Sequence, residues 1–144
     1  MRTVVLKLGG EIVQSPEIDP IARDVRALVD GWNRVAIVHG GGPQATALQR
    51  RLGLETRMVA GRRFTDPETL EVMKFVVAGQ LNVDLCGRLL ANGVMPVGLH
   101  GASGHALQAR RRPPRVMQGA GPEPVDLGLV GDVVGFNLPL LGDL

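Results

Sequence analysis

Residues 34–43 read RVAIVHGGGP, a short apolar run that ends in three glycines and a proline. A second stretch of the same kind opens the chain, where residues 3–10 read TVVLKLGG. Apolar runs of this length, rich in valine and isoleucine, are typical of buried strands. Each run is followed by a segment with helical periodicity, and the order strand, helix, strand, helix predicts a βαβα unit with a parallel sheet. The sequence therefore indicates an α/β protein.

Cap residues and apolar periodicity predict three helices, at about 19–30, 43–52 and 65–90. The first begins at Asp19-Pro20, and a glycine follows the end of each of the first two. In the third, Thr65 and Glu68 have the spacing of a capping box. Its apolar residues cover so much of its circumference that we expect it to be buried on more than one side, in a core or against another subunit.

Outside these helices the pattern is less regular. We expect an extended segment at 55–63, a third buried strand at 94–99, loops with a hairpin at 101–128, a further strand at 129–136 and a helix that Asn137 begins. A single helical turn of this kind has no stability of its own. We therefore expect the end of the chain to be an interruption, as in a truncated product, a fragment or one part of a split protein.

Composition excludes several classes of protein. With 44% apolar and 21% charged residues among 144, the chain is able to fold as one globular domain rather than remain disordered. Cys86 is the only cysteine, which excludes an internal disulfide and a cysteine zinc cluster. No run approaches the roughly eighteen apolar residues of a membrane span, and the N-terminus lacks the pattern of a signal peptide. We expect a cytoplasmic protein with no membrane partner.

The strongest functional signal is the pair of glycine turns that follow the first two strands. In a parallel sheet both turns lie at the same edge, where open α/β folds bind ligands. Glycine lets backbone N–H groups approach anionic oxygens, and the helix that follows adds a partial positive charge. Lys7, one of only two lysines, directly precedes the first turn region. Either turn alone favours a simple tight connection, but the two together with Lys7 favour an anion site.

Other patterns of catalysis are missing from the sequence. Neither turn fits the GxxxxGK[ST] motif of P-loop proteins or the GxGxxG motif of dinucleotide-binding folds. No HExxH motif or cysteine–histidine spacing indicates a metal site. We expect His39 to orient the second turn by hydrogen bonds, and His100, His105 and Ser103 to be polar loop residues.

Two clusters of arginine remain. Arg62 and Arg63 precede a predicted helix start, where positive charge is slightly unfavourable, so we expect at least one of them to bind a ligand carboxylate. A solvated pair is the alternative. The run RRRPPR at 110–115 has the charge of a nucleic-acid patch, but a chain with three Phe, one Trp and no Tyr offers few partners for base stacking. We therefore prefer a solvated hairpin tip and expect no nucleic-acid partner.

Four motifs together carry a family resemblance: KLGG at 7–10, VHGGGP at 38–43, GRRFTD at 61–66 and LGLVGDV at 127–133. Their order and spacing resemble those of the acetylglutamate kinases, of the amino-acid kinase superfamily, and the likeness covers the whole chain. Aspartate and uridylate kinases lack the combination of HGGGP with this RFTD helix start. The resemblance implies the carbamate kinase-like fold of that superfamily, a three-layer αβα sandwich with a mainly parallel sheet, here truncated.

The resemblance also implies a reaction. ATP, with Mg²⁺, would phosphorylate the γ-carboxylate of N-acetyl-L-glutamate in the second step of arginine biosynthesis. Such an enzyme must bring two anions together and stabilise the charge of the transferring phosphoryl group. Arg63 would hold the α-carboxylate of the substrate. The full set of implied roles is catalysis by Lys7 and Gly10, a phosphate cradle of Gly9, Gly10, Gly40 and Gly41, and substrate binding by Gly41, Gly42 and Arg63, with no metal-ligating side chain.

Members of this family are longer than 144 residues, and their C-terminal half supplies the nucleotide pocket and a second catalytic lysine. By resemblance, residues 1–144 correspond to the N-terminal, amino-acid-substrate-binding domain without the nucleotide-binding domain. The helix at 67–90 would form a homodimer, and the hairpin at about 105–134 would close over the substrate. A non-catalytic module that binds acylated amino acids, or a remnant of such a kinase, is the alternative function.

Overall fold

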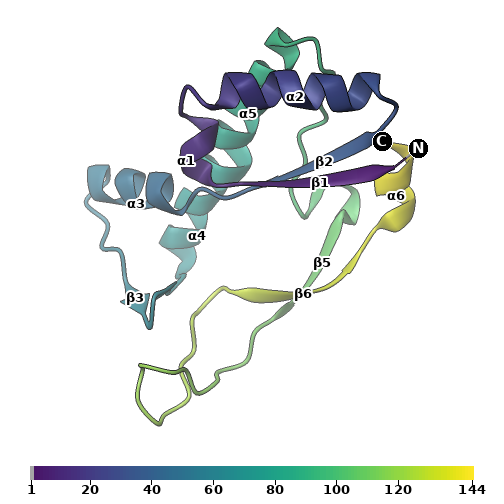
Figure 1. Ribbon diagram of the computed structural model, residues 1–144. Helices are drawn as coiled ribbons and strands as arrows, with labels where there is room; N and C mark the ends of the chain where they lie inside the picture. The colour runs from purple at the N-terminus through teal and green to yellow at the C-terminus, as the bar shows by residue number, and fades with distance from the viewer. Residues whose placement is uncertain (1) are drawn as a thin grey trace. The chain divides into compact units, whose positions relative to one another are not determined.

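The computed structural model describes residues 2–144 (Figure 1). The chain divides into two compact units. The first comprises Met1–Ala47 and Met73–Gly98, and the second comprises Leu48–Val72 and Leu99–Leu144. The chain therefore passes from one unit to the other three times.

A parallel pair of strands, β1 (Thr3–Leu8) and β2 (Arg34–His39), forms the sheet of the first unit. The register makes Leu8 and His39 partners, so the two strands end level with each other. Both strands have the predicted bounds and direction. The α/β class is confirmed.

Helix α2 (Ile18–Asp30) packs against strand β2 and against the later helix α5 (Asn82–Ala91). It ends where the sequence predicts, with Gly31 as its C-cap. The short helix α1 (Gly10–Val13), which precedes it, is not predicted, because four residues show no periodicity. The buried residues of α2 recur at helical spacing and are Ile18, Ala22 and Val25.

The third predicted helix is confirmed and has three parts. These are α4 (Pro67–Met73), a π-helical segment η1 (Lys74–Leu81) and α5, with Asn92 as the C-cap. The π-helical segment is not predicted, since its hydrophobic pattern is close to that of an α-helix. Segments with i→i+5 hydrogen bonds are rare in proteins overall, and those that occur are often found at functional sites.

The start of this helix differs from the predicted capping box. Because Pro67 occupies the first helical position, Asp66 rather than Thr65 is the N-cap. The Oδ1 atom of Asp66 accepts a hydrogen bond from the Thr69 backbone N–H at 2.7 Å. Thr65 is extended instead, and its backbone forms a bridge with Gly128. The predicted capping box is wrong.

The strand predicted at 94–99 is also wrong, because these residues lie in neither a helix nor a strand. Pro96 has no N–H to donate to a neighbouring strand. Gly98 lies against helix α5, where an added Cβ would be 2.9 Å from Asn82 Nδ2 and 3.1 Å from Cys86 Sγ. Within the first unit, this segment packs against helix α5 rather than lying in a sheet.

Two antiparallel hairpins form the sheets of the second unit. Strand β3 (Met58–Val59) pairs with β4 (Arg62–Arg63), and β5 (Leu107–Arg111) pairs with β6 (Gly131–Phe136). The first hairpin lies in the segment predicted to be extended. The strand predicted at 129–136 is confirmed and begins two residues later as β6.

The second unit also contains a short 3₁₀ helix, η2 (Ser103–His105), and helix α6 (Leu138–Asp143). Asn137 is the N-cap of α6, as predicted, and its Oδ1 accepts a hydrogen bond from the Leu140 backbone N–H at 3.2 Å. No helix within residues 2–144 combines the length and the apolar character needed to cross a membrane.

Candidate functional site

The first unit brings the two glycine turns together at one edge of its parallel sheet (Figure 1). Leu8 and His39 are register partners, and the Gly40 backbone N–H donates to the Leu8 carbonyl at 3.1 Å. The turns therefore leave their strands side by side, as the sequence predicts. Helix α1 begins at Gly10 and helix α3 (Gly42–Arg51) at Gly42, so both turns lie at helix N-termini.

Gly10 and Gly41 fit so closely that neither has room for a side chain. A Cβ on Gly10 would lie 2.6 Å from Gly41 Cα and 2.7 Å from the Gly40 carbonyl oxygen. A Cβ on Gly41 would lie 2.6 Å from Leu81 Cδ1 and 2.8 Å from Val77 Cγ2. Because Val77 and Leu81 belong to η1, the π-helical segment packs directly against the second turn.

Gln44 links the two turns through its side chain. It lies in the first turn of α3, and its Nε2 donates to the Gly10 carbonyl at 2.8 Å. Its Oε1 is buried and has no hydrogen-bond partner within residues 2–144, although a buried amide oxygen normally has one. Gln44 is not among the residues predicted from the sequence. Its place directly after Pro43, in the helical turn behind the glycines, is the signal that could identify it.

The other three glycines of the turns are not confined in this way. A Cβ on Gly9 or on Gly42 would meet no atom within 4 Å, and one on Gly40 would lie 3.7 Å from Gly10 N, an ordinary contact. None of the three has a positive φ. Packing within the protein therefore does not require glycine at these positions, and open space lies beside Gly9 and Gly42.

The backbone amides at the centre of the turns keep their donor capacity. Among the hydrogen bonds of residues 2–144, none has the amide of Gly10 or Gly41 as its donor. Buried amides are nearly always bonded in folded proteins. Two such donors, close together at helix N-termini, form an arrangement suited to anionic oxygens.

Lys7 and His39 flank these turns on their strands. Lys7 is exposed on β1, its register partner is Val38, and it belongs to none of the ion pairs within residues 2–144. His39 Nδ1 lies 3.1 Å from the Gly40 carbonyl oxygen. The prediction that His39 makes hydrogen bonds to the second turn is confirmed.

Arg63 lies in the second unit, on β4, whereas Lys7 and the glycines of the turns lie in the first. Its guanidinium donates to Oε1 of Gln49, which is 1% exposed. The same oxygen accepts from Thr56 Oγ1 at 3.2 Å, and Gln49 Nε2 donates to Thr69 Oγ1 at 3.0 Å. This buried network orients the Arg63 side chain.

Gln49 is not among the residues predicted from the sequence either. On helix α3 it follows Ala45 by four residues, and both side chains are buried, so they share one face of the helix. A polar residue in the buried register of a helix needs hydrogen-bond partners. That mismatch between residue type and register is the signal that could identify Gln49.

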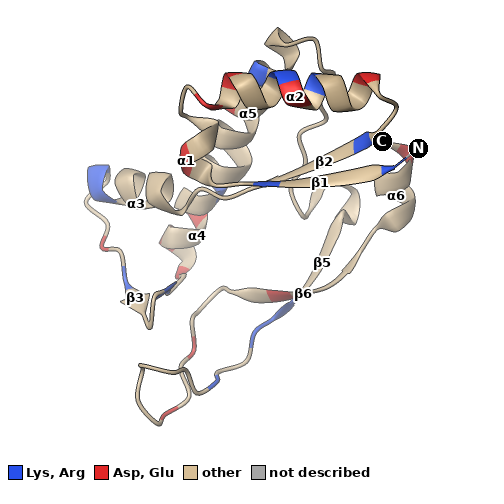
Figure 2. Cartoon of the chain, viewed as in Figure 1, with Lys and Arg blue, Asp and Glu red and all other residues tan. Residues whose placement is uncertain are grey.

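The arginine run at 110–115 is partly neutralised by acids of the same hairpin (Figure 2). One terminal nitrogen of Arg111 lies 3.1 Å from both carboxylate oxygens of Asp126, and Arg112 forms an ion pair with Asp132. The Arg112 hydrogen bond lowers the pKa of Asp132. A backbone N–H, and then Arg111, lower the pKa of Asp126. The hairpin therefore carries both positive and negative charges rather than positive charge alone.

Each unit has candidate binding residues of its own, which are hydrogen-bond donors or cationic side chains. Within residues 2–144, no three histidine, cysteine, aspartate or glutamate side chains gather into a metal-binding group. The turns of the first unit supply backbone amides and Lys7, and the second unit supplies Arg63. Donors of both kinds bind carboxylates and phosphates.

Residues 2–144 match the amino acid kinase family along their whole length. The chain belongs to the amino acid kinase family. This membership confirms the family resemblance of the four sequence motifs.

Curated relatives within this family are acetylglutamate kinases. The enzyme of Anaeromyxobacter sp. (strain K) is 90% identical over 144 residues, which are 100% of this chain and 53% of that protein. The enzyme of Sorangium cellulosum is 60% identical over 138 residues, which are 96% of this chain and 49% of that protein. The chain thus spans about half the length of the curated relatives it matches.

Solved structures share the fold over 98% of the chain. A protein from Streptococcus mutans UA159 has a TM-score of 0.78 at 21% identity, with 53% of its own chain covered. N-acetylglutamate synthase from Neisseria gonorrhoeae, complexed with coenzyme A and N-acetyl-glutamate, has a TM-score of 0.73 at 23% identity, with 30% covered. At these identities the likeness shows the fold alone, and the predicted amino-acid kinase fold is confirmed.

Proposed function

We propose that this chain is the amino-acid-binding domain of a kinase that transfers the γ-phosphoryl group of ATP, supplied with Mg²⁺, to the γ-carboxylate of N-acetyl-L-glutamate. This reaction is the second step of arginine biosynthesis, and we place it in the cytoplasm. The identity of 90% to an acetylglutamate kinase supports the choice of substrate. The observation that carries the proposal is the close fit of Gly10 against Gly41 beside two helix N-termini, where neither amide donates a hydrogen bond within residues 2–144.

Phosphoryl transfer to a carboxylate brings two anions together, so the site must offset their repulsion and stabilise the charge of the transition state. The carboxylate is ionised at neutral pH and needs no general base. The amides of Gly10 and Gly41 donate to the transferring phosphoryl group, within a cradle that Gly9 and Gly40 complete. Gly42, beside open space, lets the substrate approach the backbone.

Two side chains complete the proposed chemistry. Lys7 supplies a positive charge to the transferring phosphoryl group, and its exposed ammonium forms no ion pair within residues 2–144 that would compete for it. Arg63 binds the α-carboxylate of the substrate through a charge-assisted hydrogen bond. Because Gln49 already orients the guanidinium, less side-chain entropy is lost when the ligand binds.

We also propose a homodimer that forms through the helix at 67–90. Phe75, Val83 and Leu90 are large apolar side chains on this helix, and they are 59%, 66% and 54% exposed. Leu81, Leu85 and Leu89 are buried on the opposite side. An apolar surface on a helix that is already buried on one side is typical of a subunit interface.

Calorimetric titration of the chain with N-acetyl-L-glutamate tests the proposed substrate. We expect saturable binding with one ligand per chain. The variant Arg63→Gln should bind at least about tenfold more weakly, since a hydrogen bond to a charged group contributes about 1.5–3 kcal/mol. Arg51→Gln, which alters an exposed arginine at the end of α3, is the matched control and should bind as the unaltered chain does.

Two results would contradict this proposal. If N-acetyl-L-glutamate fails to bind at millimolar concentrations, the chain does not hold a complete amino-acid site. If Arg63→Gln binds the ligand as tightly as Arg51→Gln does, the role of Arg63 is wrong even though a site exists. A separate titration with ATP and Mg²⁺ distinguishes binding of the amino acid from binding of the nucleotide.

A further inference from the structure

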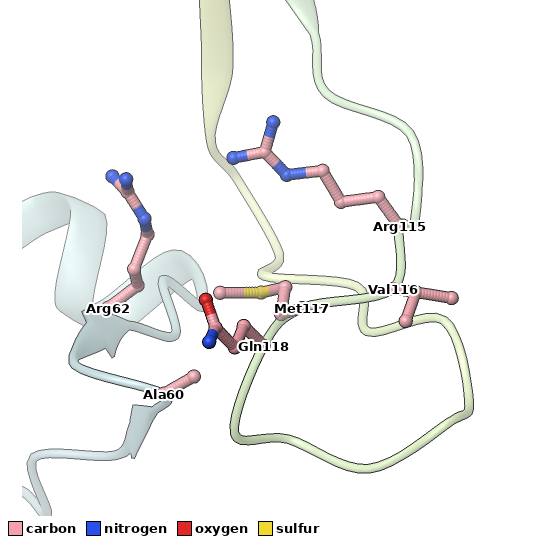
Figure 3. Close-up of a pocket in the computed structure, with 6 residues that line it drawn as sticks. All are labelled: Ala60, Arg62, Arg115, Val116, Met117 and Gln118. Atoms are coloured by element: carbon pink, nitrogen blue, oxygen red, sulfur yellow. The ribbon is translucent and has the colours of Figure 1, made fainter.

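A pocket of about 340 Å³, open to solvent, lies in the second unit, between the β3–β4 hairpin and the segment at 115–118 (Figure 3). It is lined by Ala60, Arg62, Arg115, Val116, Met117 and Gln118. None of these residues has a role in the function proposed above. The volume falls within the range of pockets that bind small molecules.

The side chains of Arg62 and Arg115 extend over the same side of this pocket (Figure 3). Neither arginine takes part in any ion pair within residues 2–144. The nearby acids of the long hairpin, Asp126 and Asp132, are bonded to other arginines, and the charge of Arg115 acts on Asp132 only as a weaker contribution that lowers its pKa. The pocket therefore has two guanidinium groups and no carboxylate among its lining residues.

Both arginines lie on backbone segments that are fixed by hairpin hydrogen bonds. Arg62 follows a two-residue hairpin turn in which Ala60 and Gly61 have φ values of +46° and +72°, as a type I′ turn requires. Arg115 is joined to Val125 by two backbone hydrogen bonds of 3.2 and 2.9 Å. The two cationic groups thus come from two separate, hydrogen-bonded hairpin elements of one unit.

Neighbouring arginines have different surroundings because of strand alternation. Arg62 and Arg63 are consecutive on β4, so their side chains point to opposite faces. Arg63 bonds the buried Gln49, while Arg62 lines the pocket. The amino-acid site proposed above and this pocket therefore use different side chains.

The lining of the pocket is partly apolar. Met117 is buried, and in the view of Figure 3 its thioether and the Gln118 carboxamide lie below the guanidinium groups of Arg62 and Arg115. A guanidinium group binds a carboxylate through two parallel hydrogen bonds. Two guanidinium groups over one side of the pocket, with a thioether below them, suit a short aliphatic chain with a carboxylate at each end. A compact phosphate would place all its charge at one point and has no aliphatic chain to contact the thioether.

We propose that this pocket binds a small dicarboxylate, with one carboxylate on Arg62, the other on Arg115 and the aliphatic chain across Met117. Gln118 adds an amide N–H to one end. The two arginines supply the affinity, and the fixed spacing of the hairpin elements that carry them selects the length of the ligand.

Titration of the full 144-residue chain with succinate, glutarate and adipate at low ionic strength tests this proposal. One length should bind best, and acetate, with a single carboxylate, should bind at least about tenfold more weakly than that ligand. Arg62→Gln and Arg115→Gln should each weaken the best ligand at least about tenfold. Arg51→Gln should leave its binding unchanged. Circular dichroism and thermal melting of each variant show that the fold is retained.

Equal binding of all three lengths and of acetate would overturn the proposal, as would full binding to the Arg62→Gln and Arg115→Gln variants. Inorganic phosphate that binds more tightly than every dicarboxylate would overturn the ligand class. Arg63→Gln separates this pocket from the amino-acid site, because it should weaken N-acetyl-L-glutamate and leave the best simple dicarboxylate unaffected. Loss of both ligands in Arg63→Gln would instead indicate a single shared site and would overturn the pocket.

Discussion

The glycine turns of the first unit and the arginine-bearing hairpins of the second unit offer positive charge to an anion by opposite means. In the turns the donors are backbone amides, and side chains are excluded because Gly10 and Gly41 pack against each other. In the hairpins the backbone is only a support, and the donors are guanidinium groups at the ends of long side chains. Arg63, for example, is oriented by the buried Gln49.

This difference decides what damages each region. A site made of backbone is sensitive to a single added methyl group, because backbone atoms of two segments must move to admit it. A site made of long side chains tolerates changes of shape but depends on the network that orients those side chains.

The variant Gly10→Ala should have the largest effect. Its Cβ would lie within 2.8 Å of three backbone atoms of the second turn, which cannot rotate away as a side chain can. We expect a loss of about 3 kcal/mol in the free energy of unfolding, measured by urea denaturation. Gly41→Ala should lose less, because its Cβ would meet the side-chain ends of Leu81 and Val77.

Gly42→Ala is the matched control for this prediction. No atom lies within 4 Å of the added Cβ, so the free energy of unfolding should change by no more than about 0.5 kcal/mol. Binding of N-acetyl-L-glutamate should nevertheless weaken, since the proposed substrate approaches this position. Equal stability of Gly10→Ala and Gly42→Ala would break the contrast, because it would mean that the turns are not tightly packed.

The two regions also differ in how far their sequence predicts them. Strands β1 and β2, their turns and the shared edge follow from apolar runs and glycines, because each of these signals is contained in about ten residues. The contacts of Gln44, Gln49 and η1 join segments distant in sequence, so no local pattern encodes them. The segment at 94–99 is an apolar run that resembles a strand, but Pro96 and packing against helix α5 decide otherwise.

Replacement of Gln49 by leucine tests the side-chain half of the contrast. Leucine has a similar volume but removes the hydrogen bonds that Gln49 makes with the guanidinium of Arg63 and with the hydroxyls of Thr56 and Thr69. We expect a loss of about 2 kcal/mol in the free energy of unfolding, because three hydrogen bonds of a buried side chain are lost together. Affinity for N-acetyl-L-glutamate should also fall, since Arg63 loses its orientation.

Gln44→Leu provides the comparison for this variant. Gln44 makes one hydrogen bond, to the Gly10 carbonyl, and its Oε1 has no partner within residues 2–144. Its loss should cost about 1 kcal/mol, which is about half the effect of Gln49→Leu. A larger loss for Gln44→Leu would show that the turns, too, depend on a side-chain network, and would narrow the difference between the two regions.

The smallest effect should come from the cap of helix α4, and it depends on pH. The Thr69 backbone N–H, and then the Thr69 hydroxyl, lower the pKa of Asp66. The folded-state pKa therefore lies below the unfolded value of about 3.9, and the ionised cap stabilises the protein fully above that pH. This contribution is lost as the pH falls through the folded-state pKa. Asp66→Ala should therefore lower the Tm at neutral pH, and the difference in Tm from the unaltered chain should narrow in acid.

Thr65→Val is the control, because Thr65 does not cap the helix and valine has a similar shape. This variant should show no such pH-dependent difference. If Thr65→Val instead reproduces the pH-dependent loss of Tm, Thr65 is the N-cap, as the capping-box pattern predicts, and Pro67 does not determine where the helix begins.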